Sequence, residues 1–430
     1  VERGWLEPGE ADAGRHSPGA KRRALEQASD RFQDRSGAPM AQEYQEFLDD
    51  SAFWLEDYAR FQAFRDDLGR RPWTEWPEGL RRHESAACDA QAERLADNIE
   101  QLRFRQFVFH CQLRELRHYA NERGVLLFGD IPIYVHLESA DVWAHQALFD
   151  LDAQGQPQTV TGVPPDYFCE EGQLWGNPQY DWSRMQETGF EWWLQRFASA
   201  AQQFDIVRID HFRALQAYWE IDASATSARE GHWVPAPGRE LLTVAQQRYP
   251  ALCLVAENLG TISPEVEELR AEFNLPGMLI LQFAFDGNPD NPYLNHRHGT
   301  GDIVYTGTHD NDTTLGWFKS LDEHTRASVY RYFDNPDESM PWMLIRRAMA
   351  SPAHTAIIPW QDFLELDGAH RMNTPGSLEG NWHWRFGWDQ VPRGVGTKIR
   401  ETLGDHRRLS GTQKPAAARP PTRNAQLTNS

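Results

Sequence analysis

Residues 204–210 read Phe-Asp-Ile-Val-Arg-Ile-Asp, a short apolar run that ends in an acid. Two later runs have the same form, Ala-Leu-Cys-Leu-Val-Ala-Glu over residues 251–257 and Ile-Val-Tyr-Thr-Gly-Thr-His-Asp over residues 303–310. Short apolar runs that are bounded by turns and separated by longer connections are typical of buried parallel strands. Because the carboxyl ends of barrel strands meet at one mouth, we expect the three acids to lie together there.

Apolar runs of this kind recur through the chain after Gly124. Their ranges are 125–128, 204–209, 251–256, 278–285, 303–306 and 356–360. Such strands, joined by connections of roughly a dozen residues or more, predict a TIM-type barrel or a doubly wound sheet. No G-x-G-x-x-G or phosphate-binding loop follows a run, which disfavours the nucleotide-binding version of such a sheet.

The parts of the chain outside these runs have a different character. Residues 43–64 place apolar side chains at near-helical spacing, and a second such stripe extends from Leu95 to Leu116, before Gly124. We therefore expect a mainly helical insertion subdomain over residues 1–123 and a catalytic barrel over residues 124–404. Residues 405–430 are rich in Pro, Ala, Thr and Asn without an apolar period, which predicts a disordered tail.

Composition excludes several classes of protein. A formal net charge of −20 disfavours nucleic acids and acidic membranes as partners, and no apolar run reaches the ~20 residues of a membrane helix. The 4 cysteines include no C-x-x-C pair, so neither a zinc site nor a disulfide framework is indicated. Residues 1–10 lack the pattern of a signal peptide, so we expect a cytoplasmic location. A neutral polymer such as a glucan carries no electrostatic penalty as a partner.

The acids at the run ends suit glycoside chemistry, because cleavage with retention needs one ionised carboxylate and one protonated carboxyl. Arg208 and Asp210 share a strand face, so the guanidinium can lower the pKa of Asp210 and keep this nucleophile ionised. Glu257 follows apolar residues and stands near another acid, so we expect its pKa to be raised, as a general acid requires. Asp310, with His309 beside it, can stabilise the transition state through sugar hydroxyls.

Each of these residues also has an ordinary structural interpretation. An acid just past a strand is commonly a helix N-cap or a surface charge. Arg208 taken alone fits a structural ion pair, and His309 taken alone fits a hydrogen-bonded polar residue. Three acids at three run ends favour the catalytic interpretation.

The runs lie within longer motifs, and these motifs carry a family resemblance. Val207-Arg-Ile-Asp-His-Phe-Arg213, Ala256-Glu-Asn-Leu-Gly260 and Tyr305-Thr-Gly-Thr-His-Asp-Asn-Asp-Thr313 resemble the catalytic signatures of the amylomaltase, or 4-α-glucanotransferase, family of the α-amylase group. Further matches lie at residues 129–135, 139–144, 162–168, 174–178, 371–376 and 380–382. The resemblance extends from about Trp54 to Arg385.

The resemblance implies an α/β fold, an α-amylase-type (β/α)8 barrel with helical insertions, which acts on maltodextrins without a metal or organic cofactor. It implies Asp210 as nucleophile, Glu257 as acid/base and Asp310 as stabiliser, in agreement with the roles argued from charge. It further implies substrate contacts from Arg208, His309, Asp130, Tyr167, Phe168, Trp175 and Asn381. Taken alone, Asp130 also fits a cap, Trp175 a core aromatic and Asn381 a turn residue.

Residues 162–182 crowd Pro, Tyr, Phe and Trp side chains into a stretch that is predicted to be a loop. An aromatic lid that stacks on sugar rings and excludes water would favour an incoming sugar hydroxyl over hydrolysis. The alternative is an ordered loop that packs on the barrel as ordinary core.

The chain departs from the family pattern at its front. The first two barrel strands of the family, and the loop that supplies an aromatic sugar platform, have no counterpart here, so we expect an incomplete barrel of strands three to eight. The favoured function is a 4-α-glucanotransferase. Its rivals are an α-glucan hydrolase with the same three acids and a non-catalytic glucan-binding remnant.

Overall fold

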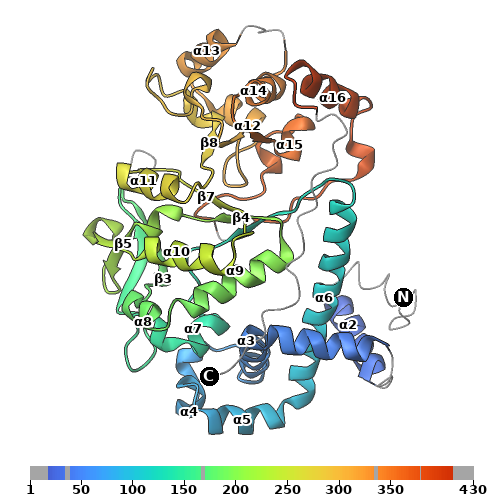
Figure 1. The fold of residues 1–430 in the computed structure, drawn as a ribbon, viewed down its shortest axis with the longest axis vertical. Coiled ribbons are helices and arrows are strands. Elements are labelled where there is room, and N and C mark those ends of the chain that lie inside the picture. The colour runs from blue at the N-terminus through green and yellow to red at the C-terminus, as the bar shows by residue number, and fades with distance from the viewer. Residues whose placement is uncertain (1–17, 34–38, 166–169, 334–337, 378, 410–430) are drawn as a thin grey trace. The chain divides into compact units, whose positions relative to one another are not determined.

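The computed structural model describes residues 18–33, 39–165, 170–333, 338–377 and 379–409 (Figure 1). The chain divides into two compact units. The first comprises Val1–Leu254 with Gly260–Leu269, and the second comprises Val255–Leu259 with Arg270–Ser430.

The first unit begins with helices, as the spacing of apolar residues predicts. They are α2 (Pro18–Gln33), α3 (Pro39–Asp67), α4 (Glu78–Arg81), α5 (Ser85–Arg94) and α6 (Ala96–Asn121). Helices α3 and α6 bury a shared cluster that includes Phe47, Leu55 and Phe107. Gly124 has a φ of 72° just after α6, a conformation that glycine adopts without steric cost. That this helical part is an insertion subdomain stays a prediction.

A parallel sheet of the order β1-β4-β7 follows, with strands β1 (Phe128–Ile131), β4 (Ile206–Ile209) and β7 (Leu254–Ala256). Of β7, Leu254 belongs to the first unit and Val255 and Ala256 to the second. The register of β1 and β4 sets Asp130 opposite Arg208. Just before β4, the Asp205 carboxylate accepts hydrogen bonds from Leu127 N (2.7 Å), Asn121 Nδ2 (2.9 Å) and Arg117 Nε (3.0 Å). The helices in this part of the chain are α7 (Ala140–Ala144), α8 (Trp182–Glu187), α9 (Glu191–Gln203), α10 (Gly238–Arg248) and α11 (Pro264–Glu272).

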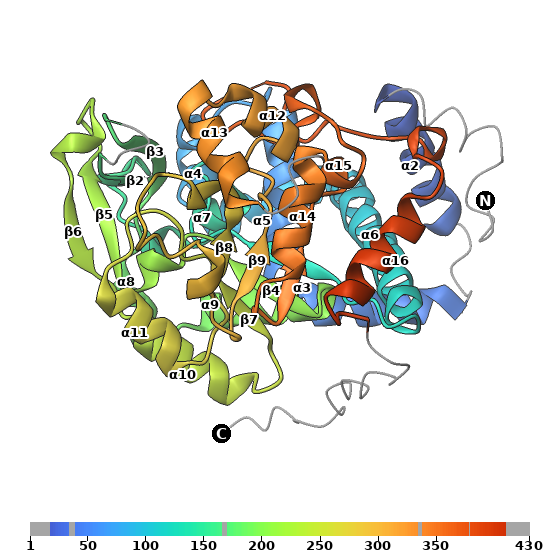
Figure 2. The same cartoon turned by 90° about the horizontal axis from the view of Figure 1, so that it is seen from above.

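Another sheet, which lies wholly in the first unit, is antiparallel, with the order β3-β2-β5-β6 (Figure 2). Its strands are β2 (Thr159–Val163), β3 (Gln173–Pro178), β5 (Ala217–Asp222) and β6 (His232–Pro235). The prediction that residues 162–182 form a loop is therefore wrong for β3, which pairs with β2 across the Gly162–Leu174 and Val163–Gln173 positions. The reason is tertiary: Gly and Pro in this stretch indicate a loop locally, but long-range pairing to β2 outweighs them.

The second unit has its own parallel sheet, of the order β10-β9-β8. Its strands are β8 (Met278–Ile280), β9 (Ile303–Tyr305) and β10 (Thr355–Ile357), and its helices are α12 (Thr314–Ser320), α13 (Glu323–Tyr332), α14 (Met340–Met349), α15 (Trp360–Phe363) and α16 (Val395–Asp405). Leu281, Val304 and Leu344 belong to one buried cluster beside the sheet. The order and direction of these strands are those of a barrel or doubly wound sheet.

The six predicted runs each overlap a parallel strand, and five of the strands are shorter than their runs. The first strand also starts at Phe128, whereas the run predicted it over residues 125–128. Val125 and Leu126 are exposed and lead into the strand without joining it. That the two parallel sheets belong to one (β/α)8 barrel stays a prediction.

The C-terminal part packs further than the predicted tail boundary suggests. Helix α16 ends at Asp405, and beyond it Arg408 donates hydrogen bonds to the carbonyls of Met349 (2.7 Å) and Ser351 (2.8 Å). Residues 410–430 lie outside the described residues, so the tail prediction is not tested there.

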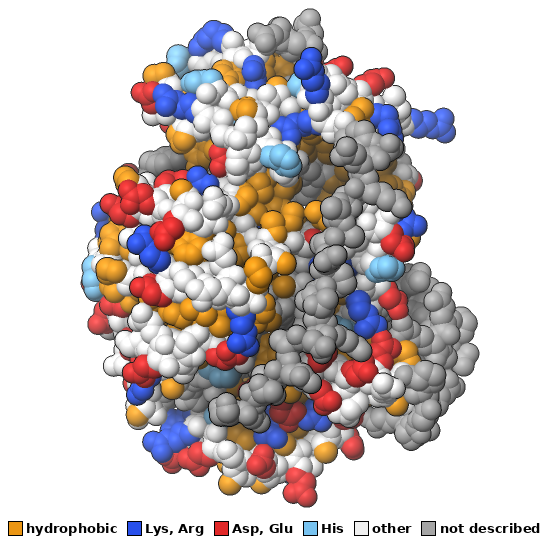
Figure 3. All heavy atoms as spheres, in the orientation of Figure 1, with side chains coloured by type: hydrophobic (Ala, Val, Ile, Leu, Met, Phe, Trp, Pro, Cys, Tyr) orange, Lys and Arg blue, Asp and Glu red, His pale blue; other side chains and the backbone are white. Residues whose placement is uncertain are grey.

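Charged side chains of both signs are visible on one face of the molecule. On the face drawn in Figure 3, Lys and Arg side chains are interspersed with Asp and Glu. Among the described residues, no helix is long and apolar enough to cross a membrane.

Candidate active site

Asp210 follows β4 and forms an ion pair with a buried arginine. Arg208 Nη2 lies 2.8 Å from Asp210 Oδ1, and its Nη1 lies 2.7 Å from Asp130 Oδ2. Arg208 on β4 and Asp210, just beyond the strand, are two residues apart and so face the same side, while Asp130 stands opposite Arg208 on β1. One guanidinium therefore bridges two carboxylates. The predicted proximity of Arg208 and Asp210 is confirmed, and Asp130 joins them.

His211, the residue after Asp210, has a left-handed backbone with φ 46°. Its ring lies 4.9 Å from that of Trp175, at 83° to it, so a residue of β3 reaches the segment that carries Asp210. Burial lowers the pKa of His211 to about 4, although the charge of Asp210 opposes this shift. The imidazole is therefore neutral at pH 7. Sequence reasoning missed His211, although it lies inside the motif around Asp210.

The segment after His211 is anchored by Arg213. This buried residue stacks its guanidinium 3.7 Å from the centroid of the Trp233 ring and donates to Thr261 O at 2.7 Å. Burial lowers the pKa of Arg213. The 3-10 helix Phe212–Leu215, which is fully buried, thereby fixes the backbone that follows the nucleophile candidate.

Glu257 lies just beyond β7 and is buried. Its Oε1 accepts a hydrogen bond from Leu259 N at 3.0 Å. The neighbouring Asn258 faces another direction, since its Oδ1 accepts from Met278 N at 2.8 Å. These two bonds fix the turn, and the burial of Glu257 is the condition that the general-acid prediction requires. The raised pKa itself stays a prediction.

Asp310 lies in the loop after β9 and is held by three side chains. Asn373 Nδ2 donates to Asp310 Oδ1 at 2.6 Å, and Arg371 Nη2 donates to Asp310 O at 3.0 Å. His309 Nε2 lies 3.2 Å from Asp310 Oδ2. Sequence reasoning missed Arg371 and Asn373 as partners of this acid, although the 371–376 motif that contains them was the available signal.

A buried acid braces the same loop at both ends. Asp362 is fully buried and accepts hydrogen bonds from Thr306 Oγ1 (2.6 Å), Thr314 Oγ1 (2.7 Å) and Thr314 N (2.8 Å). Burial raises the pKa of Asp362, while these bonds oppose the shift. The two ends of the loop from β9 to α12, which carries His309 and Asp310, are thus hydrogen-bonded to the same carboxylate.

Asn381 braces a second loop near this acid. Its Oδ1 accepts from Thr374 N and its Nδ2 donates to Ser377 O, both at 2.9 Å. These bonds give Asn381 a structural role, and its predicted contact with substrate stays a prediction. The next residue, Trp382, has a left-handed backbone with φ 64° and places its ring 5.2 Å from that of His309.

The predicted site residues are divided between the two units. Asp130, Trp175, Arg208 and Asp210 belong to the first unit, and Glu257, His309, Asp310 and Asn381 belong to the second. Tyr167 and Phe168 lie outside the described residues. Within the units, the structure groups Asp130 with Arg208 and Asp210, and His309 with Asp310. The convergence of the three acids at one mouth stays a prediction.

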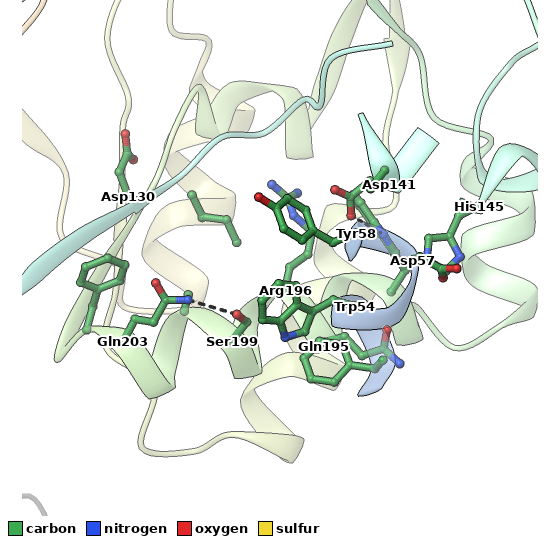
Figure 4. A pocket seen from close by; sticks show the side chains of 16 residues that line it. Trp54, Asp57, Tyr58, Asp130, Asp141, His145, Gln195, Arg196, Ser199 and Gln203 are labelled. Atoms are coloured by element: carbon green, nitrogen blue, oxygen red, sulfur yellow. Dashed lines mark hydrogen bonds between the residues drawn. The ribbon is translucent and has the colours of Figure 1, made fainter. Parts of the chain in front are cut away.

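A cavity of about 290 Å³ lies in the first unit, between α3 on one side and β1, α7 and α9 on the other (Figure 4). Trp54, Tyr58 and Arg196 line it, with Asp130 at one end and His145 at the other. Among the described residues, no group of three His, Cys, Asp or Glu side chains could hold a metal ion.

Comparisons with known proteins agree with this architecture. A family model described as 4-alpha-glucanotransferase matches residues 15–389. The chain is 43% identical over 386 residues to a 4-alpha-glucanotransferase of Thermus thermophilus, covering 88% of this chain and 77% of that protein. It is 44% identical over 375 residues to a 4-alpha-glucanotransferase of Synechocystis sp., covering 86% and 74% respectively.

Among solved structures, the chain is similar to the amylomaltase from Streptococcus agalactiae in complex with acarbose. The TM-score is 0.86 and the sequence identity is 34%, with 91% of this chain and 79% of that chain covered. The chain therefore has an amylomaltase-like α/β fold and belongs to the 4-α-glucanotransferase family.

Proposed function

We propose that this chain is a 4-α-glucanotransferase that moves α-1,4-glucan segments between maltodextrins with retention of configuration. The observation that carries the proposal is the bridge that buried Arg208 makes between Asp210 and Asp130. The guanidinium, 2.8 Å from Asp210 Oδ1, holds this carboxylate in one orientation, as attack on an anomeric carbon requires.

In the proposed reaction, Asp210 attacks the anomeric carbon of the donor glucan while Glu257 gives its proton to the departing glycosidic oxygen. The bond between the anomeric carbon and that oxygen breaks, and an ester to Asp210 forms. The ionised Glu257 then takes the proton of an acceptor hydroxyl, whose oxygen displaces Asp210. Retention follows from two inversions, and requires the two carboxyl groups to stand about 5–5.5 Å apart.

Asp310 would bind sugar hydroxyls more tightly in the distorted, oxocarbenium-like state than in the ground state. Its fixed position supports this role, because Asn373 and Arg371 hold its carboxylate and its carbonyl. A group that is already oriented costs no reorganisation when charge develops on the sugar.

Transfer in place of hydrolysis requires that water be kept from the glycosyl ester. We propose that the aromatic stretch 162–182 provides this exclusion. Trp175 supports the assignment, since its partly exposed ring contacts His211, the residue next to the nucleophile. We also propose that the six parallel strands are strands three to eight of an α-amylase-type (β/α)8 barrel, and that the enzyme works in the cytoplasm.

Incubation of the purified chain with maltotriose tests the reaction. A transferase gives glucose together with longer maltodextrins, whereas a hydrolase gives only glucose and maltose. Asp210→Asn should lower the rate of transfer by several orders of magnitude, because a carboxamide cannot form the ester, while maltodextrin binding persists. The exposed Asp97→Asn is the matched control. Retained turnover in Asp210→Asn would refute the nucleophile assignment.

The acid role has a separate test. Glu257→Gln should impair natural glucans far more than a glycosyl fluoride donor, because fluoride leaves without a proton. The exposed Glu240→Gln should affect neither donor. Equal losses on both donors would show that Glu257 is not the general acid.

A further inference from the structure

The second unit carries an unusual run of exposed aromatic side chains. Over residues 382–389 aromatic residues alternate with His, Arg, Gly and Asp. Trp382 is 55% exposed, Phe386 36% and Trp388 78%, and Trp384 is partly buried. Single exposed aromatics are common, but adjoining ones mark an interaction site.

Three of these rings, those of Trp384, Phe386 and Trp388, adjoin one another and form the aromatic surface. Trp384 stacks on Phe386 with ring centroids 5.6 Å apart and an angle of 22°, and Phe386 meets Trp388 edge-on at 5.4 Å. Trp360 lies 5.9 Å from Phe386 and in turn contacts Phe363 of α15. The surface is therefore supported from α15, while its outer rings stay exposed.

The backbone beneath the rings is held in place by hydrogen bonds. Arg385 Nη1 donates to the carbonyls of Trp384 (2.6 Å) and Trp382 (3.3 Å). Trp382, which has a left-handed backbone, donates its N–H to Met372 O at 2.7 Å. That conformation is unfavourable for a bulky side chain, so the fold bears a cost to present this ring.

The segment that carries the aromatic surface also places a ring beside the candidate stabiliser. The Trp382 ring lies 5.2 Å from His309, whose Nε2 is 3.2 Å from Asp310 Oδ2. All these residues belong to the second unit. Trp384 follows Trp382 by two residues, which places the aromatic surface a short distance along the chain from the ring beside His309.

We propose that Trp384, Phe386 and Trp388 form an outer binding surface for an α-1,4-glucan chain, beyond the sugars that contact Asp310. This inference rests on the proposed function. The apolar faces of sugar rings stack on aromatic side chains, and the interleaved His383, Arg385 and Asp389 offer hydrogen-bonding groups to hydroxyls. A neutral polymer with apolar ring faces and polar edges matches this alternation.

The consequence is a preference for long glucans. A maltotriose molecule bound at the acids would not extend to Trp388, whereas an amylose chain would. Removing one exposed ring should weaken amylose binding on the order of tenfold, as expected from the apolar area lost. The same change should leave maltotriose disproportionation within about twofold, since no contact at the acids is altered.

The test uses the full chain and soluble amylose as the probe. Native electrophoresis in gels that contain amylose measures binding without catalysis, and initial rates with amylose or maltotriose as donor measure turnover. Trp388→Ala and Phe386→Ala should lose retardation in the gel and raise KM for amylose, while Trp388→Tyr should keep both near wild type. Phe109→Ala, which removes a ring that is 54% exposed on α6, is the matched control.

Three results would overturn the proposal: unchanged amylose affinity in Trp388→Ala, equal losses on maltotriose and amylose, or the same loss in Phe109→Ala. A change of oligomeric state in Trp388→Ala without a change in amylose affinity would show that the surface docks a second copy instead. If wild type makes no longer products from maltotriose, the proposed function fails, while gel retardation still decides whether this surface binds glucan.

Discussion

The His211 side chain makes the stability of this protein depend on pH in a calculable way. Burial lowers its pKa from 6.5 to about 4, Asp210 opposes the shift, and Arg213 and Arg208 add to it. Because the unfolded state binds the proton at higher pH than the folded state does, the stabilisation is complete above about pH 6.5 and is lost as the pH falls towards about 4. The full pKa shift of His211 corresponds to a change of about 3 kcal/mol in the free energy of unfolding.

A comparison with His211→Asn isolates this contribution. Asparagine carries no titrating group and tolerates the left-handed backbone at φ 46° better than most residues do. Between about pH 7.5 and about pH 5, the free energy of unfolding of the wild type should fall by about 2 kcal/mol more than that of the variant. The remaining acids and bases titrate in both proteins and cancel in the difference.

Urea unfolding followed by tryptophan fluorescence at the two pH values measures this difference. The His118→Asn variant, which removes a side chain that is 74% exposed, should behave like the wild type. Titration of the ring protons by NMR, assigned by the resonance missing from His211→Asn, gives the pKa directly. An identical pH dependence in wild type and His211→Asn, or a ring that titrates near 6.5, would refute the reasoning.

Other substitutions test the supports of the site. Asn373→Ala should lower kcat on maltotriose on the order of tenfold to 100-fold with little change in KM, because the 2.6 Å bond to Asp310 is lost; an unchanged kcat contradicts it. Gly129→Ala should cost about 1–3 kcal/mol, seen as a lower melting temperature, since a Cβ would stand 2.1 Å from the Phe204 ring; an unchanged melting temperature would mean that the ring moves aside freely. Arg208→Lys should reduce kcat/KM on the order of 100-fold, because a point charge cannot bridge two carboxylates as a guanidinium does; wild-type kinetics would show that the bridge is dispensable.

The parallel strands could be predicted because their signal is local. Runs such as Ile303–Tyr305 are apolar on both faces, as strands buried between helices must be, and each is found in its predicted range or next to it. The exact residue at which each strand begins or ends could not be predicted, since burial and not composition decides where pairing stops. The antiparallel sheet was missed altogether: β2 pairs with β5, about 60 residues away, and nothing local specifies that pairing.

The candidate site shows the same division. Asp210, Glu257 and Asp310 could be selected because they end apolar runs, and the pairing of Arg208 with Asp210 follows from the two-residue period of a strand. The partners Asn373 and Arg371 could not, because they reach Asp310 from a segment more than 60 residues further on. The unusual pKa of His211 likewise arises from tertiary burial, which no local pattern reveals.

The carboxylate of Asp205 bears on how the first unit comes apart. It accepts from Arg117 and Asn121 on or at the end of α6, and from the backbone of Leu127, which leads into β1. Burial acts to raise the pKa of Asp205, but these bonds outweigh it and lower the pKa, so the charge is retained. Fraying at the C-terminal end of α6 would leave this charge, which lies just before β4, without two of its hydrogen-bond donors. The helix end and the two strands should therefore open as one cooperative unit and exchange their amide hydrogens together.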